Sequence, residues 1–240
     1  MSLAIAVIAA LPSAIVLAHG AWWSLLSVVA LPRPRPPLPP TRSWRLAVIV
    51  PAHNEELLLG ACLDSLLAAP CDRRPEVVVV TDNCDDATAE VARSRGVTVL
   101  ERRSESLRGK SYALDHALAY LHAQPLPPEA VVFVDADTVV SPELYGCLES
   151  AFAAGALAAQ VHYAPAAAHG DLAALRRLAL SLVHWSRPLG ASRLRLGSGL
   201  KGNGMALRWE LVRDGFGSSG ITEDAALTVR LACRGVPVRF

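Results

Sequence analysis

Short apolar runs alternate with amphipathic stretches through the chain after residue 45. The runs are followed by segments whose apolar residues recur at helical spacing, as in residues 57–67, 85–94 and 109–122. Near-continuous valine runs are typical of parallel strands that are buried on both faces. The pattern therefore predicts a doubly wound α/β fold. Its expected strands lie in residues 46–50, 76–83, 96–100 and 130–137.

The pattern is less regular after residue 150. It predicts a strand at residues 156–162, an amphipathic helix at 171–185 and a glycine-rich loop at 196–205. The apolar face of the amphipathic helix has two interpretations, packing within the domain or contact with a membrane surface, and we expect packing. The last predicted helix has Thr222 placed as its N-cap and Gly235 placed as its C-terminal stop.

The N-terminal segment has a different character, because residues 3–30 contain no Asp, Glu, Lys or Arg. About 20 such residues suffice to cross a bilayer. We therefore predict a transmembrane anchor over residues 1–31, with a helix kinked at Pro12. A cleaved signal peptide is the alternative, but the segment lacks a basic leader and is longer than a usual signal core.

A proline- and arginine-rich segment, residues 32–45, separates this anchor from the domain predicted over residues 46–240. Such a composition predicts a stiff, extended spacer. Arginines that flank one end of a span favour the cytoplasmic side. We therefore expect the protein at the inner, cytoplasmic membrane with its catalytic domain in the cytoplasm.

Overall charge excludes one class of partner. The chain has 23 Lys and Arg against 22 Asp and Glu, which gives a formal net charge of +1. This balance supplies no positive field for a phosphate backbone. We therefore expect no nucleic-acid partner.

Three polar clusters follow predicted strands directly, at residues 51–56, 81–86 and 135–138. Ligands of doubly wound sheets bind beyond the carboxyl ends of the strands, so we expect one site there. In the first cluster Asn54 could cap a helix and Glu55 could bind a ribose. In the second, Asp85 is the natural helix cap, which leaves Asp82 able to accept from a ring N–H of a bound base.

Asp135 and Asp137 end an apolar run, and strand alternation would direct both carboxylates to the same side. Two anions facing one space need a shared proton, a basic group or a cation. Mg²⁺ or Mn²⁺ fits best, because these cations prefer oxygen ligands. Aspartates that merely cap a loop remain the alternative.

Two further segments could serve either a functional role in the site or a purely structural one. Lys110 lies in an "RGKS" segment, but Ser104 stands where a phosphate loop requires its first glycine. Lys110 could instead reach a phosphate as a point charge, or simply be solvated. Glu223 and Asp224 open a helix, whose dipole stabilises acids there, and a general base could also stand at that position.

Six segments together resemble the family 2 inverting glycosyltransferases of the GT-A fold, in particular the bacterial membrane-bound branch related to cellulose and poly-N-acetylglucosamine synthases. They are "VIVPAHNEE", "VVTDNCDDAT", "RGKSYALDHAL", "VVFVDADT", "GLKGNGMAL" and "ITEDAALTVRL", in the order of the family. The resemblance covers residue 46 to the end. It implies a GT-A, Rossmann-like, three-layer α/β/α domain with a mostly parallel sheet.

The resemblance also implies roles for individual residues. Glu223 and the loop residues Gly202, Asn203 and Gly204 would lie beside the donor sugar and the acceptor, and Asp224 would be the general base. The donor side would comprise Ala52, His53 and Glu55 around the nucleoside, Asp82 at the uracil, Lys110 near the base and diphosphate, Asp135 by the ribose and metal, and Asp137 as the metal ligand.

The function expected from these roles is transfer of a sugar from a nucleotide-sugar donor, a UDP-sugar, to a hydroxyl of a lipid or polysaccharide acceptor, with Mg²⁺ or Mn²⁺. The alternatives are a non-catalytic nucleotide-sugar-binding or scaffold subunit and a phosphate-loop nucleotide hydrolase. The chain reaches Phe240 without the Q-x-x-R-W segment of related enzymes. We therefore expect it to be part of a longer protein.

Overall fold

The computed structural model describes residues 3–32, 42–164, 170–216 and 223–240. Most of the predicted spacer and the predicted N-cap Thr222 lie outside these residues. The chain forms two compact units. One comprises residues 1–35, 162–198 and 240, and the other comprises residues 36–161 and 199–239.

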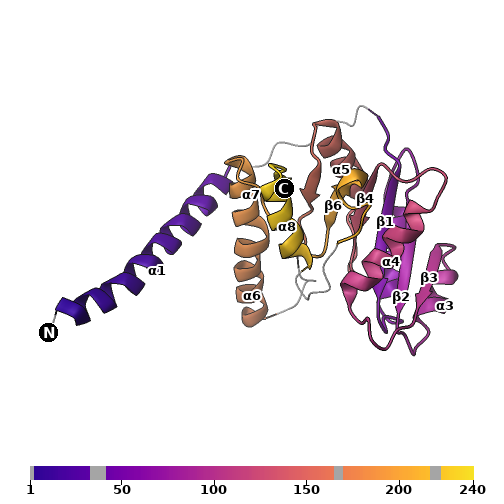
Figure 1. Cartoon of the computed structure of the whole chain (residues 1–240), viewed down its shortest axis with the longest axis horizontal. Helices are drawn as coiled ribbons and strands as arrows, with labels where there is room; N and C mark the ends of the chain where they lie inside the picture. Colours follow the sequence, from indigo (N-terminus) through magenta and orange to yellow (C-terminus); the bar gives the residue numbers. More distant parts are fainter. Residues whose placement is uncertain (1–2, 33–41, 165–169, 217–222) are drawn as a thin grey trace. The chain divides into compact units, whose positions relative to one another are not determined.

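A seven-stranded sheet with the order β3-β2-β1-β4-β6-β5-β7 forms the centre of the larger unit (Figure 1). The first four strands of that order are parallel, whereas β6 runs antiparallel to both β4 and β5. This arrangement confirms the expected mostly parallel sheet. The strands are β1 (Leu46–Ala52), β2 (Glu76–Asp82), β3 (Thr98–Arg102), β4 (Ala130–Phe133), β5 (Ala158–Gln160), β6 (Met205–Arg208) and β7 (Val238–Arg239).

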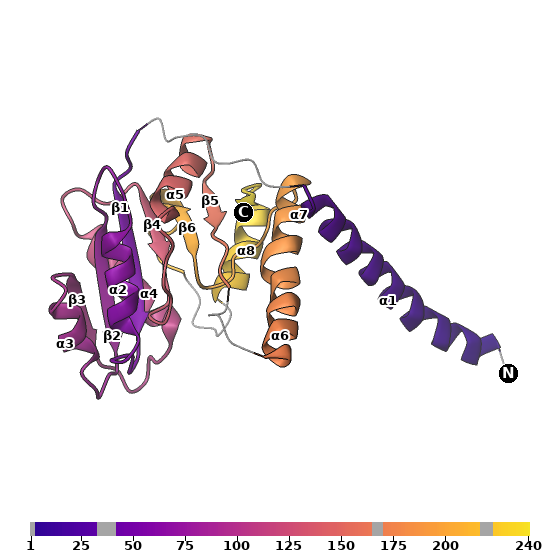
Figure 2. The same ribbon diagram turned by 180° about the vertical axis from the view of Figure 1, so that it is seen from behind.

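Helices cover both faces of the sheet, because successive residues of a strand point to opposite sides. In β1, Val48 and Val50 contribute to one core cluster and Ala47 and Ile49 to the other. The first cluster includes α2 (Leu59–Ala68), α3 (Thr88–Arg93) and α5 (Leu144–Ala153), and the second includes α4 (Lys110–His122) and α8 (Glu223–Cys233). Figures 1 and 2 show these two faces from opposite sides. The three-layer α/β/α prediction is confirmed.

Several element boundaries differ from the expected ones. Strand β1 continues through Pro51, and β4 already ends at Phe133. Helix α3 begins at Thr88, and Asp85 is not its cap. Asp86 accepts hydrogen bonds from the backbone N–H and the hydroxyl of Thr88 instead.

Helix α5 and strand β6 were not expected from the sequence pattern. Strand β6 follows the glycine-rich loop directly and pairs Met205 with Phe133 of β4. It is only four residues long, which is too short to show a clear alternation of apolar and polar residues. A short 3-10 helix, Trp209–Leu211, follows it. The expected stop at Gly235 is confirmed by its positive φ of 69°, two residues beyond the end of α8.

The smaller unit contains helices only among its described residues. Helix α1 (Leu3–Ala30) is accompanied by α6 (Asp171–Ser181), a π-helical segment (Leu182–Ser186) and α7 (Arg187–Arg193). By length and composition, residues Pro12–Ala30 of α1 could cross a membrane.

Helix α7 contacts the C-terminal end of α1 closely. Arg193 donates hydrogen bonds to the carbonyl oxygens of Val29 (2.7 Å) and Pro32 (2.5 Å). A Cβ atom at Gly190 would lie 2.1 Å from the carbonyl oxygen of Leu26, so only glycine permits this approach. The guanidinium of Arg187 lies over the ring of Trp23. Orphan carbonyls at the end of α1 thus find donors on α7.

We predict different costs for two leucine truncations near the start of α2. Leu63 is fully buried against the sheet, whereas Leu57 lies before the helix and is exposed. Leu63→Ala should lower the free energy of unfolding by about 2 to 5 kcal/mol, because it removes buried methyl groups and leaves a cavity. Leu57→Ala should change it by less than about 0.5 kcal/mol. Thermal unfolding in detergent measures both, and equal losses would contradict the core assignment.

Candidate active site

A pocket of about 940 Å³ opens at the carboxyl ends of β1, β2 and β4. Its position follows from the topology, because loops after parallel strands meet at one edge of the sheet. The expected donor-side residues all line it. They are Ala52, His53, Glu55, Asp82, Lys110, Asp135 and Asp137.

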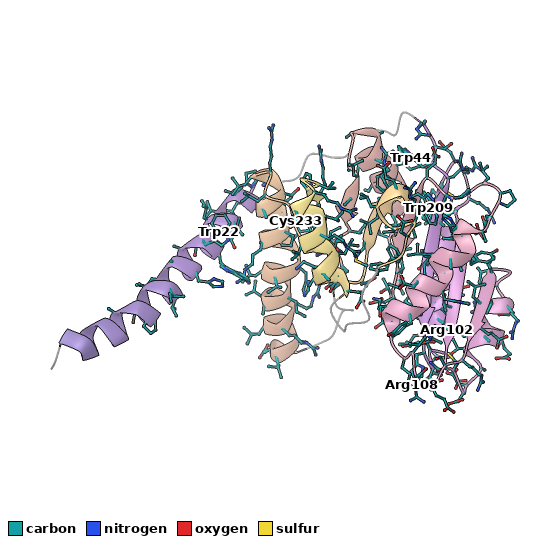
Figure 3. All side chains as sticks on the ribbon, in the orientation of Figure 1. Trp22, Trp44, Arg102, Arg108, Trp209 and Cys233 are labelled. Carbon is teal, nitrogen blue, oxygen red and sulfur yellow. The ribbon has the colours of Figure 1, made fainter. Side chains whose placement is uncertain are left out.

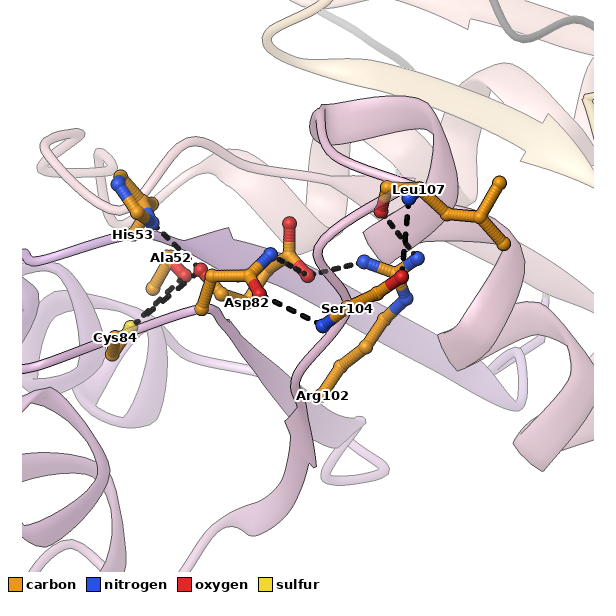
Figure 4. A network of polar contacts seen from close by, with 8 residues as sticks. Ala52, His53, Asp82, Cys84, Arg102, Ser104 and Leu107 are labelled. Atoms are coloured by element: carbon orange, nitrogen blue, oxygen red, sulfur yellow. Dashed lines mark hydrogen bonds and ion pairs between the residues drawn. The ribbon is translucent and has the colours of Figure 1, made fainter.

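Asp82, at the end of β2, is held by Arg102 at the end of the neighbouring strand β3 (Figure 4). Arg102 Nη1 lies 2.5 Å from Asp82 Oδ1, and both side chains are about nine-tenths buried. Asn83 Nδ2 donates to the same oxygen at 3.2 Å. Within the described part of the chain, the structure gives Oδ2 of Asp82 no hydrogen-bond partner. This oxygen is therefore able to accept a bond from a ligand.

The loops after β1 and β2 are joined to each other at the pocket wall. His53 Nδ1 lies 2.7 Å from the backbone oxygen of Asp82 (Figure 4), and Asn54 Oδ1 accepts from the N–H of Asp85 at 2.8 Å. Asn54 and Asn83 both adopt positive φ angles, 55° and 54°, a conformation that asparagine tolerates better than most residues. The suggestion that Asn54 caps a helix is wrong, since it ties two loops together.

Lys110 is the first residue of helix α4 and lines the pocket. Its Nζ forms an ion pair with Asp135 Oδ1 and donates to the carbonyl oxygen of Gly202 at 3.2 Å. The positive charge therefore offsets the carboxylate of Asp135. This pairing is one of the three kinds of partner that the two aspartates required.

Asp137 lies in a different environment from Asp135. Because β4 ends at Phe133, both aspartates lie in the loop that follows, where the Thr138 N–H donates to the Asp135 carbonyl. The argument from strand alternation was therefore wrong, although both residues still line the pocket. The Asp137 carboxylate is exposed and accepts one long hydrogen bond, 3.5 Å, from the Thr138 hydroxyl.

Several carboxylates lie near Glu55 at this end of the pocket, among them Asp137 and Asp135. Partial burial raises the pKa of Glu55, and the nearby charge of Asp137 raises it further. Such a cluster of oxygen donors is chemically suited to Mg²⁺ or Mn²⁺. Among the described residues, no group of three or more His, Cys, Asp and Glu side chains is arranged to hold a metal ion. A cation here would need additional ligands from a bound substrate or water.

The glycine-rich loop before β6 is fixed to the Asp135 loop by Asn203. Asn203 Oδ1 accepts from the N–H of Asp135 at 3.2 Å, and its Nδ2 donates to the Thr138 hydroxyl at 2.8 Å. The buried Gln160 donates to the carbonyl oxygen of Asn203 at 2.7 Å and accepts from the N–H of Lys201 at 2.9 Å. These hydrogen bonds hold Asn203 next to the loop that carries Asp135 and Asp137.

Asp224, in the first turn of α8, approaches the same loop at Gly202. A methyl group at Gly202 would lie 3.6 Å from Asp224 Oδ2 and 3.6 Å from Lys110 Nζ. The Thr228 hydroxyl accepts from the N–H of Leu200 at 2.8 Å and so joins α8 to the loop. Asp224 is half-buried, and its neighbour Glu223 is buried.

Gly204 completes the loop and begins the pairing with β4. Its N–H donates to the carbonyl oxygen of Phe133 at 2.8 Å. A Cβ atom there would lie 3.2 Å from that of Val161, and its φ is 70°. Through Gly202 and Asn203 this loop contacts the pocket residues Lys110 and Asp135, although Gly202, Asn203 and Gly204 are not themselves among the residues that line the pocket.

Arg102, Arg108 and Gln160 were not among the predicted site residues. Figure 3 shows Arg102 and Arg108 at the end of the sheet opposite to Trp44 and Trp209. Arg102 could have been found from its register opposite Asp82 in the parallel sheet. Gln160 could have been suspected as an uncharged polar residue in an apolar strand, whereas Arg108 gives no comparable signal.

Among curated proteins, this chain is similar in sequence to glycosyltransferases. A 4,4'-diaponeurosporenoate glycosyltransferase of Staphylococcus haemolyticus is 35% identical over 102 residues, which are 41% of this chain and 25% of that protein. Its counterpart in Staphylococcus aureus is 38% identical over 94 residues, which are 38% of this chain and 24% of that protein. The match thus spans about a quarter of the length of these curated relatives.

Solved structures share the fold at lower sequence identity. A mannosyltransferase from Pyrobaculum calidifontis, solved with GDP-Man and Mn²⁺, is 23% identical with a TM-score of 0.68, over 96% of this chain and 65% of that chain. A glucosyl-3-phosphoglycerate synthase from Mycobacterium tuberculosis, solved with Mn²⁺, UDP-Glc and glycerol 3-phosphate, is 22% identical with a TM-score of 0.55. That match covers 82% of this chain and 69% of that chain.

The family assignment rests on a match that extends over most of the chain. The model described as "Glycosyltransferase like family 2" matches residues 43–240. This range contains every residue of the pocket and of the glycine-rich loop described above. The chain belongs to the family 2 glycosyltransferases.

Proposed function

We propose that the protein is a metal-dependent inverting glycosyltransferase that moves a sugar from a UDP-sugar to a hydroxyl of a lipid or polysaccharide acceptor. The observation that carries the proposal is the meeting of three charged groups around Gly202. Lys110 and Asp135 form an ion pair there, and a Cβ atom at the same glycine would lie 3.6 Å from both Lys110 Nζ and Asp224 Oδ2. A phosphate-binding cation and a separate carboxylate thus flank the position where a donor sugar would lie.

The nucleoside would occupy the part of the pocket formed by Ala52, His53, Glu55 and Asp82. Arg102 and Asn83 both contact Oδ1 of Asp82, which leaves Oδ2 as the oxygen available to a base. One acceptor suits the single N3–H of uracil. Guanine presents two adjacent donors, N1–H and N2–H, which would engage both carboxylate oxygens. This difference favours a UDP-linked donor over a GDP-linked one.

Asp137 would be the main protein ligand of Mg²⁺ or Mn²⁺, with Asp135 second. The exposure of Asp137 supports this order, because the charge of Asp135 is already offset by Lys110. The bound cation would supply neutralisation of the charge that develops on the departing diphosphate. Lys110 would add a second positive charge near the same group.

Asp224 would accept the proton of the acceptor hydroxyl. Its half-buried carboxylate lies at the rim formed by the glycine-rich loop, where the lack of a side chain at Gly202 leaves space for substrate. With Asp224 as the base and the diphosphate leaving beside Lys110, the acceptor hydroxyl would attack the anomeric carbon from the face opposite to the leaving group and invert it. Gly204, Asn203 and Glu223 would shape the acceptor and sugar side.

The anchor and the acceptor class belong to the same proposal. Residues 1–31 would anchor the protein in the cytoplasmic membrane, residues 32–45 would serve as a spacer, and residues 46–240 would form the catalytic domain in the cytoplasm. The apolar length of α1 supports this arrangement. The staphylococcal relatives are named as glycosyltransferases of 4,4'-diaponeurosporenoate, which supports a lipid acceptor here.

Asp137→Ala should lower turnover of a UDP-sugar by about a hundredfold or more, since it removes the main metal ligand. Titration with Mn²⁺ and measurement of UDP release give the turnover and the apparent metal affinity. The matched control is Asp72→Ala, an exposed aspartate outside the pocket. Equal turnover in both variants would contradict the role of Asp137.

Asp224→Asn should lower kcat by about a hundred- to ten-thousandfold, because the amide cannot take the acceptor proton. Binding of UDP, measured by calorimetry with Mn²⁺, should stay nearly unchanged, since Asp224 lies outside the nucleoside pocket. Asp214→Asn, at an exposed aspartate outside the site, provides the control. Binding of UDP by the wild-type chain without sugar transfer or donor hydrolysis would support a non-catalytic subunit instead.

A further inference from the structure

Helix α6 carries an apolar surface that no described residue covers. Its members, here called the α6 leucine surface, are Leu172, Leu175, Leu178 and Leu182, with Leu182 in the first position after the helix. Their side chains are 82%, 63%, 61% and 40% exposed. None of the residues of α6 is buried.

The four leucines lie on one side of the helix. At 3.6 residues per turn they fall within an arc of about 120°. The half-buried Ala173 and Leu180 lie on the opposite side of the helix. The amphipathic pattern predicted packing for the leucines, and that expectation is wrong for the described structure, because the leucines face outward.

An exposed stripe of this kind indicates a partner. Contiguous apolar surface is rare on soluble monomers and usually marks a protein or membrane contact. Apolar side chains that remain in water forgo the free energy gained on burial. The position of the helix within its own unit identifies the partner.

Helix α6 continues through the π-helical segment into α7, and α7 is fixed to the C-terminal end of α1 by Arg193 and by the close approach at Gly190. Figures 1 and 2 show α6 and α1 diverging from this shared contact at α7. Near the contact, the apolar residues Val28 of α1 and Leu31, just after the helix, are exposed. A helix that leaves the end of a membrane span in this way is held close to the bilayer surface.

We propose that the α6 leucine surface docks on the bilayer, so that α6 lies in the membrane interface. The proposal rests on the membrane anchor included in the proposed function. Arg176 is exposed on α6 beside the leucine surface and complements anionic lipid headgroups, whereas Arg177 lies on the other side of the helix. Exposed leucines beside arginines are the composition of interfacial amphipathic helices.

Spin labels on the full chain, reconstituted in vesicles of phosphatidylcholine and anionic phosphatidylglycerol, test the proposal. The native thiols that are not buried, Cys71, Cys147 and Cys233, are first replaced by serine. Single nitroxides are then attached in the variants Leu175→Cys on the surface, Ser181→Cys on another side of the helix, and Leu17→Cys within the candidate span. Collision with oxygen, which concentrates in the bilayer, is compared with collision with a water-soluble nickel complex.

We expect the oxygen-to-nickel collision ratio at Leu175→Cys to be severalfold higher than at Ser181→Cys and to approach that at Leu17→Cys. A water-like ratio at Leu175→Cys, with a bilayer ratio at Leu17→Cys, would overturn the docking of α6 and leave the anchor intact. Low collision with both reagents at Leu175→Cys would also overturn it, because the surface would then be covered by protein. A water-like ratio at Leu17→Cys would overturn the anchor and this proposal together, while the assays of Asp137 and Asp224 test the enzymatic proposal separately.

Discussion

The ion pair between Lys110 and Asp135 is the contact on which the arrangement of the site depends. It joins the start of α4 to the loop after β4, and the same ammonium group reaches the glycine-rich loop through the carbonyl oxygen of Gly202. Three segments that are distant in the chain thus share one positive charge. Two negative groups can lie near each other at this point because that charge offsets part of their repulsion.

The sheet supplies the rigid frame for this contact. Strand β6 returns antiparallel beside β4, which places the glycine-rich loop against the loop that carries the aspartates. Asn203 and the buried Gln160 then hold the two loops together through side-chain hydrogen bonds. On the other side of the pocket, Arg102 fixes Asp82 through the register of two parallel strands. Rigid elements therefore position both the nucleoside side and the reaction side.

Sequence patterns predicted the parallel part of the fold well, because long valine runs and helical spacing give strong signals. They did not predict α5 or β6. For β6 the reason is its length, because a four-residue strand after several glycines shows almost no alternation of apolar and polar residues. They placed Asp135 and Asp137 on a strand, although β4 ends two residues earlier. They also assigned the helix cap to Asp85 when Asp86 contacts Thr88, because several adjacent acids are equally suitable by type.

The sequence alone determined the doubly wound class, the family, the carboxyl edge as the place of the site and the apolar N-terminal segment. These features depend on local periodicity and on the order of short motifs. Only the tertiary structure decided which charges meet. Arg102 lies opposite Asp82, Lys110 pairs with Asp135 rather than Asp137, and the leucines of α6 face outward. Such contacts depend on strand register and on packing between segments far apart in the chain, which no local pattern encodes.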